Sequence, residues 1–176
     1  AVAYRNRYVR TPYWDDDGSD IKSLIDPDRS PANTHVVRHA GQWLALRSLD
    51  SHQPVVDEYP DFDDNLRHAF RRETELFFDS LVREDRSILE LITADYTFVN
   101  ERLALHYGLP NVQGSRFRQV TLTDPNRWGL LGKPGIHLIT SYPNRTSPVL
   151  RGAWILEHLT GTPPAQPPPN VEAFPE

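Results

Sequence analysis

Cysteine and methionine are both absent from this chain of 176 residues. Without cysteine the chain can form no disulfide, no zinc–thiolate site and no C-x-x-C-H haem attachment. Position 1 is alanine, not methionine, so we expect a processed or excised piece of a longer product.

An excess of basic residues is also lacking, since 19 Lys and Arg stand against 24 Asp and Glu and give a net charge of -5. A nucleic-acid partner is therefore not expected. No apolar run reaches the roughly 18 residues that cross a bilayer, and no signal-peptide core stands at the start, so the sequence predicts no membrane span. With 38% hydrophobic and 24% charged residues, the composition is typical of one globular domain.

Apolar residues recur at helical spacing through the first two thirds of the chain. The longest predicted helix has Phe70 and Phe77 on its buried face and Asp61 as its N-cap. Another ends at Gly108 before Pro110, which is a usual stop signal. The helices predicted here cover residues 33–49, 62–82, a short segment capped by Ser87, and 96–106.

The texture becomes irregular after Pro110. The run from Phe117 to Leu122 is compatible with a strand or an extended loop, and Asp124 begins a turn or caps a helical turn. A short apolar stretch follows at 136–139. The last predicted helix is clearer: Ser147 caps it, Pro148 is its first residue, and Gly161 closes it.

These patterns predict a mainly α fold with a helical, bundle-like first part and a small irregular α+β second part. The tail is rich in proline and is expected to form an extended strap. The expected divisions are an irregular arm at 1–32, a helical domain at 33–110, a companion domain packed on it at 111–161, and the proline-rich tail at 162–176.

Glu73 is the most informative carboxylate, because it lies between Phe70 and Phe77 on the apolar stripe of the long helix. Burying an unpaired charge costs several kcal/mol, so Glu73 needs a partner. The arginines that could serve are Arg86, Arg102, Arg145 and Arg151. We favour a structural ion pair between Glu73 and Arg151 over a general acid or base.

A second cluster combines Arg145, Thr146 and Ser147 with Arg151 at the start of the last helix. Guanidinium groups, hydroxyls and free backbone N–H groups at a helix N-terminus suit an anion. The simpler interpretation, which we prefer, is a helix cap with internal salt bridges. No residues in a Ser/His/Asp order can be singled out as catalytic.

A metal site is not predicted. His35 and His39 stand four residues apart and would share a helix face, but this spacing is only half of a site and no further ligands can be identified. The chain is expected to carry no cofactor of its own.

Long strings of the chain resemble a known family. The segments QWL at 42–44, DFDDNLRHAFRRETELFF at 61–78 and REDRSILELITADYTFVNERLALHYGLP at 83–110 resemble a helical domain of unknown function. That domain occurs in large secreted proteins of planctomycetes, acidobacteria and verrucomicrobia that often carry a c-type cytochrome module. The segments GLL at 129–131, TSYPNRTSPVLRGAWILE at 140–157 and GTPP at 161–164 resemble the companion domain that follows it.

This tandem resemblance covers about residues 40–171 and implies a bacterial periplasmic or extracellular location. It also implies that any haem belongs to a neighbouring domain that is missing here. The implied partners are other domains or subunits of a larger protein.

The first residues show a different similarity. The strings AYRNRYVRTPYW at 3–14 and ANTHVVRHAGQWLAL at 32–46 are similar to two separate pieces of the carotenoid cleavage oxygenases, iron enzymes on a seven-bladed propeller. Neither piece carries a residue that matches an iron ligand, so no oxygenase site is implied. We expect the first 40 residues to lie outside the helical family, and a spliced or artificial origin of this arm stays open.

The function expected from these observations is a non-catalytic structural or interaction module of a secreted, cytochrome c-associated bacterial protein. The alternatives are a fragment of a periplasmic redox enzyme or of a carotenoid-type oxygenase, or a composite chain without a natural function.

Overall fold

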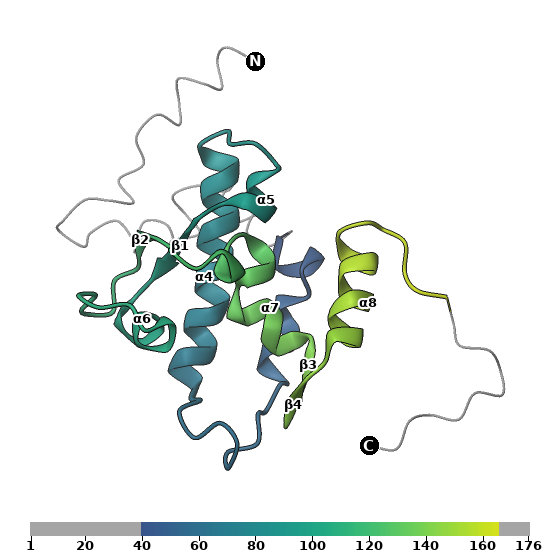
Figure 1. Cartoon of the computed structure of the whole chain (residues 1–176), viewed down its shortest axis with the longest axis horizontal. Coiled ribbons are helices and arrows are strands. Elements are labelled where there is room, and N and C mark those ends of the chain that lie inside the picture. Colours follow the sequence, from purple (N-terminus) through teal and green to yellow (C-terminus); the bar gives the residue numbers. More distant parts are fainter. Residues whose placement is uncertain (1–39, 166–176) are drawn as a thin grey trace, which may run out of the picture.

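The computed structural model describes residues 40–165, and this part of the chain is mainly helical with two small antiparallel sheets (Figure 1). The predicted arm at 1–32, the first part (33–39) of the helix predicted over 33–49, and most of the predicted strap (166–176) lie outside the described residues. The predicted fold class is therefore confirmed in its coarse form, as a mixed but mainly helical chain.

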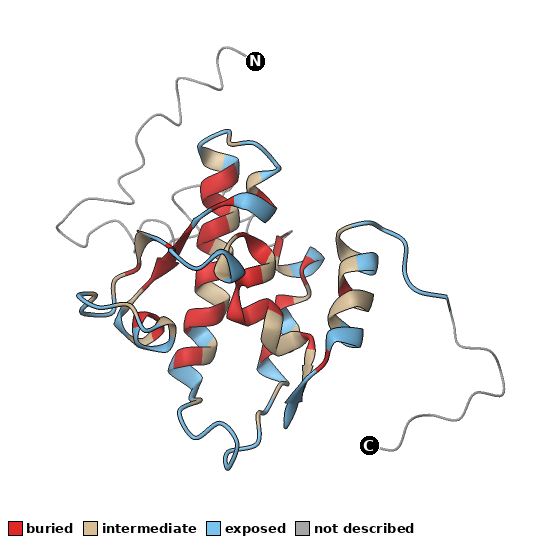
Figure 2. Ribbon diagram, viewed as in Figure 1, coloured by how far each residue is buried: buried red, intermediate tan, exposed pale blue. Residues whose placement is uncertain are grey.

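The long helix α4, Asp64–Arg83, lies at the centre of the molecule. Its cap is Asp63, whose Oδ1 accepts a hydrogen bond of 2.6 Å from the Leu66 amide. The helix predicted over 62–82 is thus confirmed, with Asp63 and not Asp61 as its N-cap. Figure 2 shows the buried residues as a stripe along α4 that faces the other elements.

The described part of the chain begins with one helical turn at residues 40–43, which is followed by the 3-10 helix η1, Leu46–Asp50. Ala45 takes a left-handed conformation with φ 55°, and this breaks the helix that the sequence predicted over 33–49. This segment runs beside α4 in the opposite direction (Figure 1).

After α4 come a short helix, a strand, another helix and a second strand. They are α5, Glu90–Thr93; β1, Tyr96–Val99; α6, Glu101–Tyr107; and β2, Arg118–Thr121. Strands β1 and β2 pair antiparallel with Tyr96 opposite Thr121 and Val99 opposite Arg118.

The prediction of one helix over 96–106 was wrong in its first half, which is β1. The physical reason is the composition of the segment: Tyr, Thr, Phe and Val favour a pleated strand, and the pairing with β2 satisfies their backbone groups. Asn100 then caps α6 by accepting from the Leu103 amide at 3.0 Å. Gly108, with φ 70°, ends α6 as predicted.

The second half of the chain forms short elements around one side of α4. They are η2, Pro125–Arg127; η3, Leu130–Gly132; α7, Pro134–Ile139; β3, Ser141–Tyr142; β4, Arg145–Thr146; and α8, Pro148–His158. The caps predicted at Asp124 and Ser147 are confirmed. Helix α7 packs against α4 and η1, whereas α8 lies at the edge and buries Trp154.

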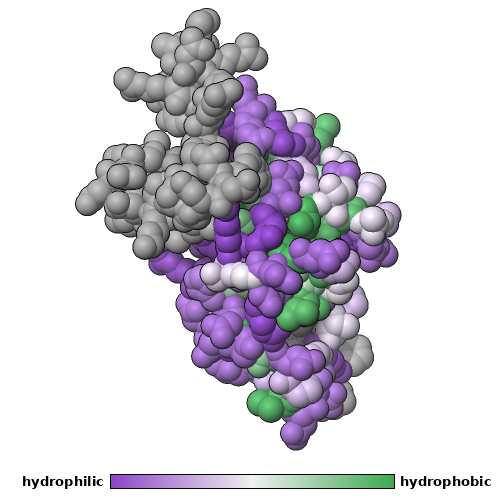
Figure 3. Space-filling model, turned by 90° about the vertical axis from the view of Figure 1, so that its left-hand side faces the viewer, coloured by the Kyte–Doolittle hydropathy of each residue, from purple (hydrophilic) through white to green (hydrophobic). Residues whose placement is uncertain are grey.

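One hydrophobic core joins these elements, with Phe77, Phe98, Leu103 and Ile136 fully or almost fully buried. On the face seen in Figure 3 most of the surface is hydrophilic, and hydrophobic residues form small separate groups. None of the helices in residues 40–165 has the length and apolar character that a membrane crossing requires.

Candidate functional site

The polar centre of the core is Glu73, which lies on the buried face of α4 with 0% of its surface exposed. Its Oε1 accepts a hydrogen bond of 2.5 Å from Thr97 Oγ1 and one of 2.6 Å from the Tyr107 hydroxyl. Its Oε2 has no hydrogen-bond partner among residues 40–165. Glu73 therefore ties α4 to β1 and to the end of α6.

The core also contains a cation that interacts electrostatically with Glu73. This cation is Lys133, which is 0% exposed. Lys133 stands between η3 and α7, and its Nζ donates to the carbonyl oxygen of Tyr96 at 3.3 Å. The same Nζ lies 4.5 Å from the centre of the Phe77 ring, which is a cation–π distance. We call Glu73, Thr97, Tyr107 and Lys133 the buried cluster.

The charges of the buried cluster affect one another. Burial raises the pKa of Glu73, and the charge of Lys133 and the two hydrogen bonds oppose this shift. Burial lowers the pKa of Lys133 to about 8, and the charge of Glu73 opposes that shift. Burial also raises the pKa of Tyr107, and Glu73 raises it further. Each charged group thus relieves part of the other's desolvation.

Local sequence explains how Lys133 reaches this position. Pro134 begins α7, and Gly135 lies against α4 so closely that a Cβ there would stand 3.2 Å from the Phe70 carbonyl oxygen and 3.3 Å from Thr74 Oγ1. The missing side chain lets the start of α7 approach α4. Lys133, the residue before α7, is carried into the core by this approach.

Chemically, the buried cluster has the carboxylate, phenol and amine of a proton-transfer site, but it is closed. Glu73 and Lys133 expose none of their surface, and Tyr107 is half-buried. A substrate could reach the two charges only if the core opened. The arrangement therefore suits a structural pair better than a general acid or base.

The structure does not bring the predicted pair Glu73 and Arg151 together. Arg151 donates to Thr140 Oγ1 at 3.3 Å and to Thr146 Oγ1 at 3.2 Å, near the start of α8. Glu73 instead has Thr97, Tyr107 and Lys133 as its surroundings. The physical reason is that α7, and not α8, packs directly on α4.

Two further arginines that the sequence offered to Glu73 have other partners. Arg86 pairs with Glu84 at 2.6 Å and with Glu90 at 3.2 Å. Arg102 pairs with Asp63 at 3.1 Å.

The predicted anion-binding residues do lie near one another. Ser147 is buried and its Oγ accepts from the Leu150 amide at 3.2 Å, while Thr146 and Arg151 share a hydrogen bond. Arg145 lies with its guanidinium 5.0 Å from the centre of the Tyr142 ring. That this group holds an anion stays a prediction.

Within residues 40–165, no three His, Cys, Asp or Glu side chains are grouped so that they could hold a metal ion. His35 and His39 lie outside the described residues.

Sequence reasoning found Glu73 but missed Lys133, Thr97 and Tyr107. A usable signal for Lys133 was its setting, since GLLGKPGIHLI at 129–139 surrounds one lysine with glycine, proline and aliphatic residues. A lysine surrounded by such residues is expected to be buried, and a buried cation needs an anionic partner, just as the buried carboxylate of Glu73 needs a cation. Nothing comparable marked Thr97 or Tyr107.

Comparison with known families gives two matches along the chain. Residues 13–109 match the model of PSD4, a protein of unknown function (DUF1592), and residues 127–176 match that of PSCyt3, a protein of unknown function (DUF1588). No curated protein matches the chain. No solved structure matches it either.

The first match corrects one expectation. It begins at residue 13, so most of the arm lies inside the family, although we expected the first 40 residues to lie outside it. The comparisons give no support to the similarity with carotenoid cleavage oxygenases. Tandem regions of unknown function, of the type associated with cytochrome c, are confirmed. A PSCyt3 region (DUF1588) occupies the second part of the chain. The first match spans more than half of the chain's residues, and the chain therefore belongs to the PSD4 family of proteins of unknown function (DUF1592).

Proposed function

We propose that this chain is a non-catalytic structural module of a larger bacterial protein, in which the PSD4 and PSCyt3 regions form one folding unit. The protein is secreted to the periplasm or the cell exterior, and the module binds other domains or subunits of the same assembly. The cytochrome c-associated type of the two families supports this setting.

The observation that carries the proposal is the origin of the residues in the buried cluster. Glu73, Thr97 and Tyr107 belong to the PSD4 match, whereas Lys133 belongs to the PSCyt3 match. A buried charge that loses its partner destabilises a fold by about 3–5 kcal/mol. Each region thus contains a buried charge whose opposite charge lies in the other region.

Close backbone packing supports the same conclusion. Gly129 has φ 58°, and its amide donates to the Ala94 carbonyl oxygen at 2.9 Å. A Cβ on Gly129 would stand 2.4 Å from the Ile92 carbonyl oxygen. At Gly129, the start of the PSCyt3 region therefore packs directly on the backbone of the PSD4 region, and this contact leaves no room for a side chain at residue 129.

A covalently attached c-type haem does not fit this chain. A c-type attachment needs cysteines, and the chain has none. Haem, where the parent protein carries it, belongs to a neighbouring domain, and the role proposed for this module is to support such domains.

Hydrogen exchange in the full chain tests the single folding unit. The Ala104 amide in α6 bonds to Asn100, and the His137 amide in α7 bonds to Lys133. If the two regions unfold together, both amides exchange with the same free energy once denaturant makes global unfolding dominant. Exchange of His137 at a clearly lower free energy would mean that the second region opens alone, and would contradict the proposal.

A substitution gives the matched comparison. Lys133→Met should lower the free energy of exchange at Ala104, in the other region, because Glu73 loses its cation. Arg145→Gln, at an exposed residue of the same PSCyt3 region, should leave Ala104 unchanged.

A further inference from the structure

The two opposite charges of the buried cluster interact without touching. Glu73 and Lys133 each expose 0% of their surface, and the charge of each one acts on the pKa of the other. Their side chains nevertheless form neither a hydrogen bond nor an ion pair with each other. The carboxylate and the amine are therefore close in space but not in direct contact.

Both groups keep hydrogen-bonding capacity that residues 40–165 do not use. Glu73 Oε2 has no hydrogen-bond partner among these residues. The amine of Lys133 carries three hydrogens, and its one acceptor among them is the carbonyl oxygen of Tyr96 at 3.3 Å. A buried carboxylate oxygen without a donor is costly, and buried polar atoms in native proteins are nearly always bonded. Oε2 thus requires a donor that these residues do not supply.

The carboxylate is held from its other side. Glu73 Oε1 accepts from Thr97 Oγ1 at 2.5 Å and from the Tyr107 hydroxyl at 2.6 Å. Thr97 belongs to β1 and Tyr107 to α6, so two separate elements fix this oxygen. A shift of the carboxylate toward Lys133 would lengthen one or both of these short bonds.

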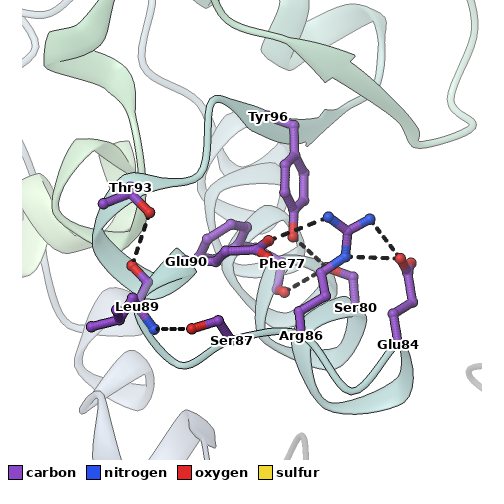
Figure 4. A network of polar contacts seen from close by, with 9 residues as sticks. All are labelled: Phe77, Ser80, Glu84, Arg86, Ser87, Leu89, Glu90, Thr93 and Tyr96. Carbon is purple, nitrogen blue, oxygen red and sulfur yellow. Dashed lines mark hydrogen bonds and ion pairs between the residues drawn. The ribbon is translucent and has the colours of Figure 1, made fainter.

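The amine is held equally firmly, because its acceptor belongs to a well-fixed residue. Figure 4 shows the Tyr96 side chain pointing toward Ser80 and Arg86. The Tyr96 hydroxyl lies 3.4 Å from Ser80 Oγ, and the Arg86 guanidinium lies 4.9 Å from the centre of the Tyr96 ring. The Phe77 ring, 4.5 Å from Lys133 Nζ, fixes the amine from another direction. The pair therefore cannot close into direct contact without losing these interactions.

We infer that one internal water molecule bridges the pair, donating a hydrogen bond to Glu73 Oε2 and accepting one from Lys133 Nζ. Internal waters characteristically bond to buried polar groups that the protein leaves unsatisfied. Water suits both ends, whereas an anion would face the Glu73 carboxylate and a metal cation would face the Lys133 ammonium. The inference does not depend on the proposed function, since it concerns the hydration of this pair alone.

A crystal structure of the full chain, at a resolution that places internal waters, tests the inference directly. We expect density for a single water within about 3.2 Å of both Glu73 Oε2 and Lys133 Nζ. Direct contact between these two atoms, no density between them, or density that refines as an ion would each overturn the inference.

Oxygen-17 magnetic relaxation dispersion gives a second measurement in solution, because it counts long-lived internal waters. Glu73→Leu combined with Lys133→Met removes both polar ends and should lose one such water. Arg145→Gln, at an exposed residue, should lose none. An unchanged count in a double variant that keeps the circular dichroism spectrum of the parent chain would overturn the inference. If the double variant does not keep that spectrum, the crystal structure decides.

Discussion

The Tyr107 hydroxyl donates a hydrogen bond to Glu73 Oε1 across 2.6 Å and so fastens the last residue of α6 to the middle of α4. The acceptor is a buried carboxylate that a second donor, Thr97, also approaches. A hydrogen bond to such a group contributes more than one between neutral surface groups.

Tyr107→Phe removes this hydroxyl while keeping the ring. We expect the free energy of unfolding to fall by about 1–3 kcal/mol, because Glu73 loses one of its two donors. Urea denaturation followed by circular dichroism measures the change. Tyr142→Phe, at a tyrosine that is 42% exposed, is the matched control and should have little effect. Equal effects of the two substitutions would contradict the role of Tyr107.

Glu73 and Lys133 should behave as a coupled pair in a double-mutant cycle. Glu73→Gln and Lys133→Met should each destabilise the fold by about 3–5 kcal/mol, since each leaves the other charge buried without a partner. The double variant should cost much less than the two single changes combined, because no buried charge is left. Strictly additive effects in urea denaturation would show that the two groups do not interact.

The lowered pKa of Lys133 predicts a specific pH dependence. The folded-state pKa is about 8, below the ordinary value of 10.5, so between these values the unfolded chain binds more protons at this group. The contribution of Lys133 to stability should therefore rise as pH rises through this window and stay constant below about pH 8. The wild-type chain should gain stability relative to the Glu73→Gln/Lys133→Met variant between pH 8 and about 9.5. Parallel stability curves for the two proteins would refute the shift.

Much of the helical framework was predictable from the sequence because its signals are local. The cap of α8 at Ser147 and the end of α6 at Gly108 depend on the residues beside them. Strand β1 was missed although its residues favour a strand, because the apolar residues of 96–106 also fit helical spacing and only the pairing with β2, which lies beyond α6 in the chain, decides between the two.

The partner of Glu73 could not be predicted either, because it is also set by contacts between segments that lie far apart in the chain. A stripe of apolar residues shows that the carboxylate is buried, but only the packing of α7 on α4 selects Lys133 from all the cations available. Several arginines were equally plausible by sequence, and two of them, Arg86 and Arg102, pair with other carboxylates.

Two glycines of the second half should respond very differently to alanine. Gly129→Ala should destabilise by about 2 kcal/mol or more, since the new Cβ would collide with backbone at Ile92 and φ 58° is strained for alanine. Gly152→Ala, in α8 with nothing within 4 Å of the new Cβ, should be neutral or stabilise by up to about 1 kcal/mol. Melting temperatures in one buffer give the comparison, and a harmless Gly129→Ala would contradict the close packing of the two regions.

Amine labelling tests most directly whether the two regions share one core. The chain has only two lysines, Lys22 and Lys133, so mass spectrometry can follow Lys133 acetylation alone. Lys133 is fully buried and should react only through unfolding. Leu103→Ala, in α6 of the PSD4 region, should cost about 2–5 kcal/mol and speed the labelling of Lys133 by at least about thirty-fold if the regions unfold together. An unchanged labelling rate in a variant shown to be destabilised would mean that the PSCyt3 region opens on its own, and would contradict the account.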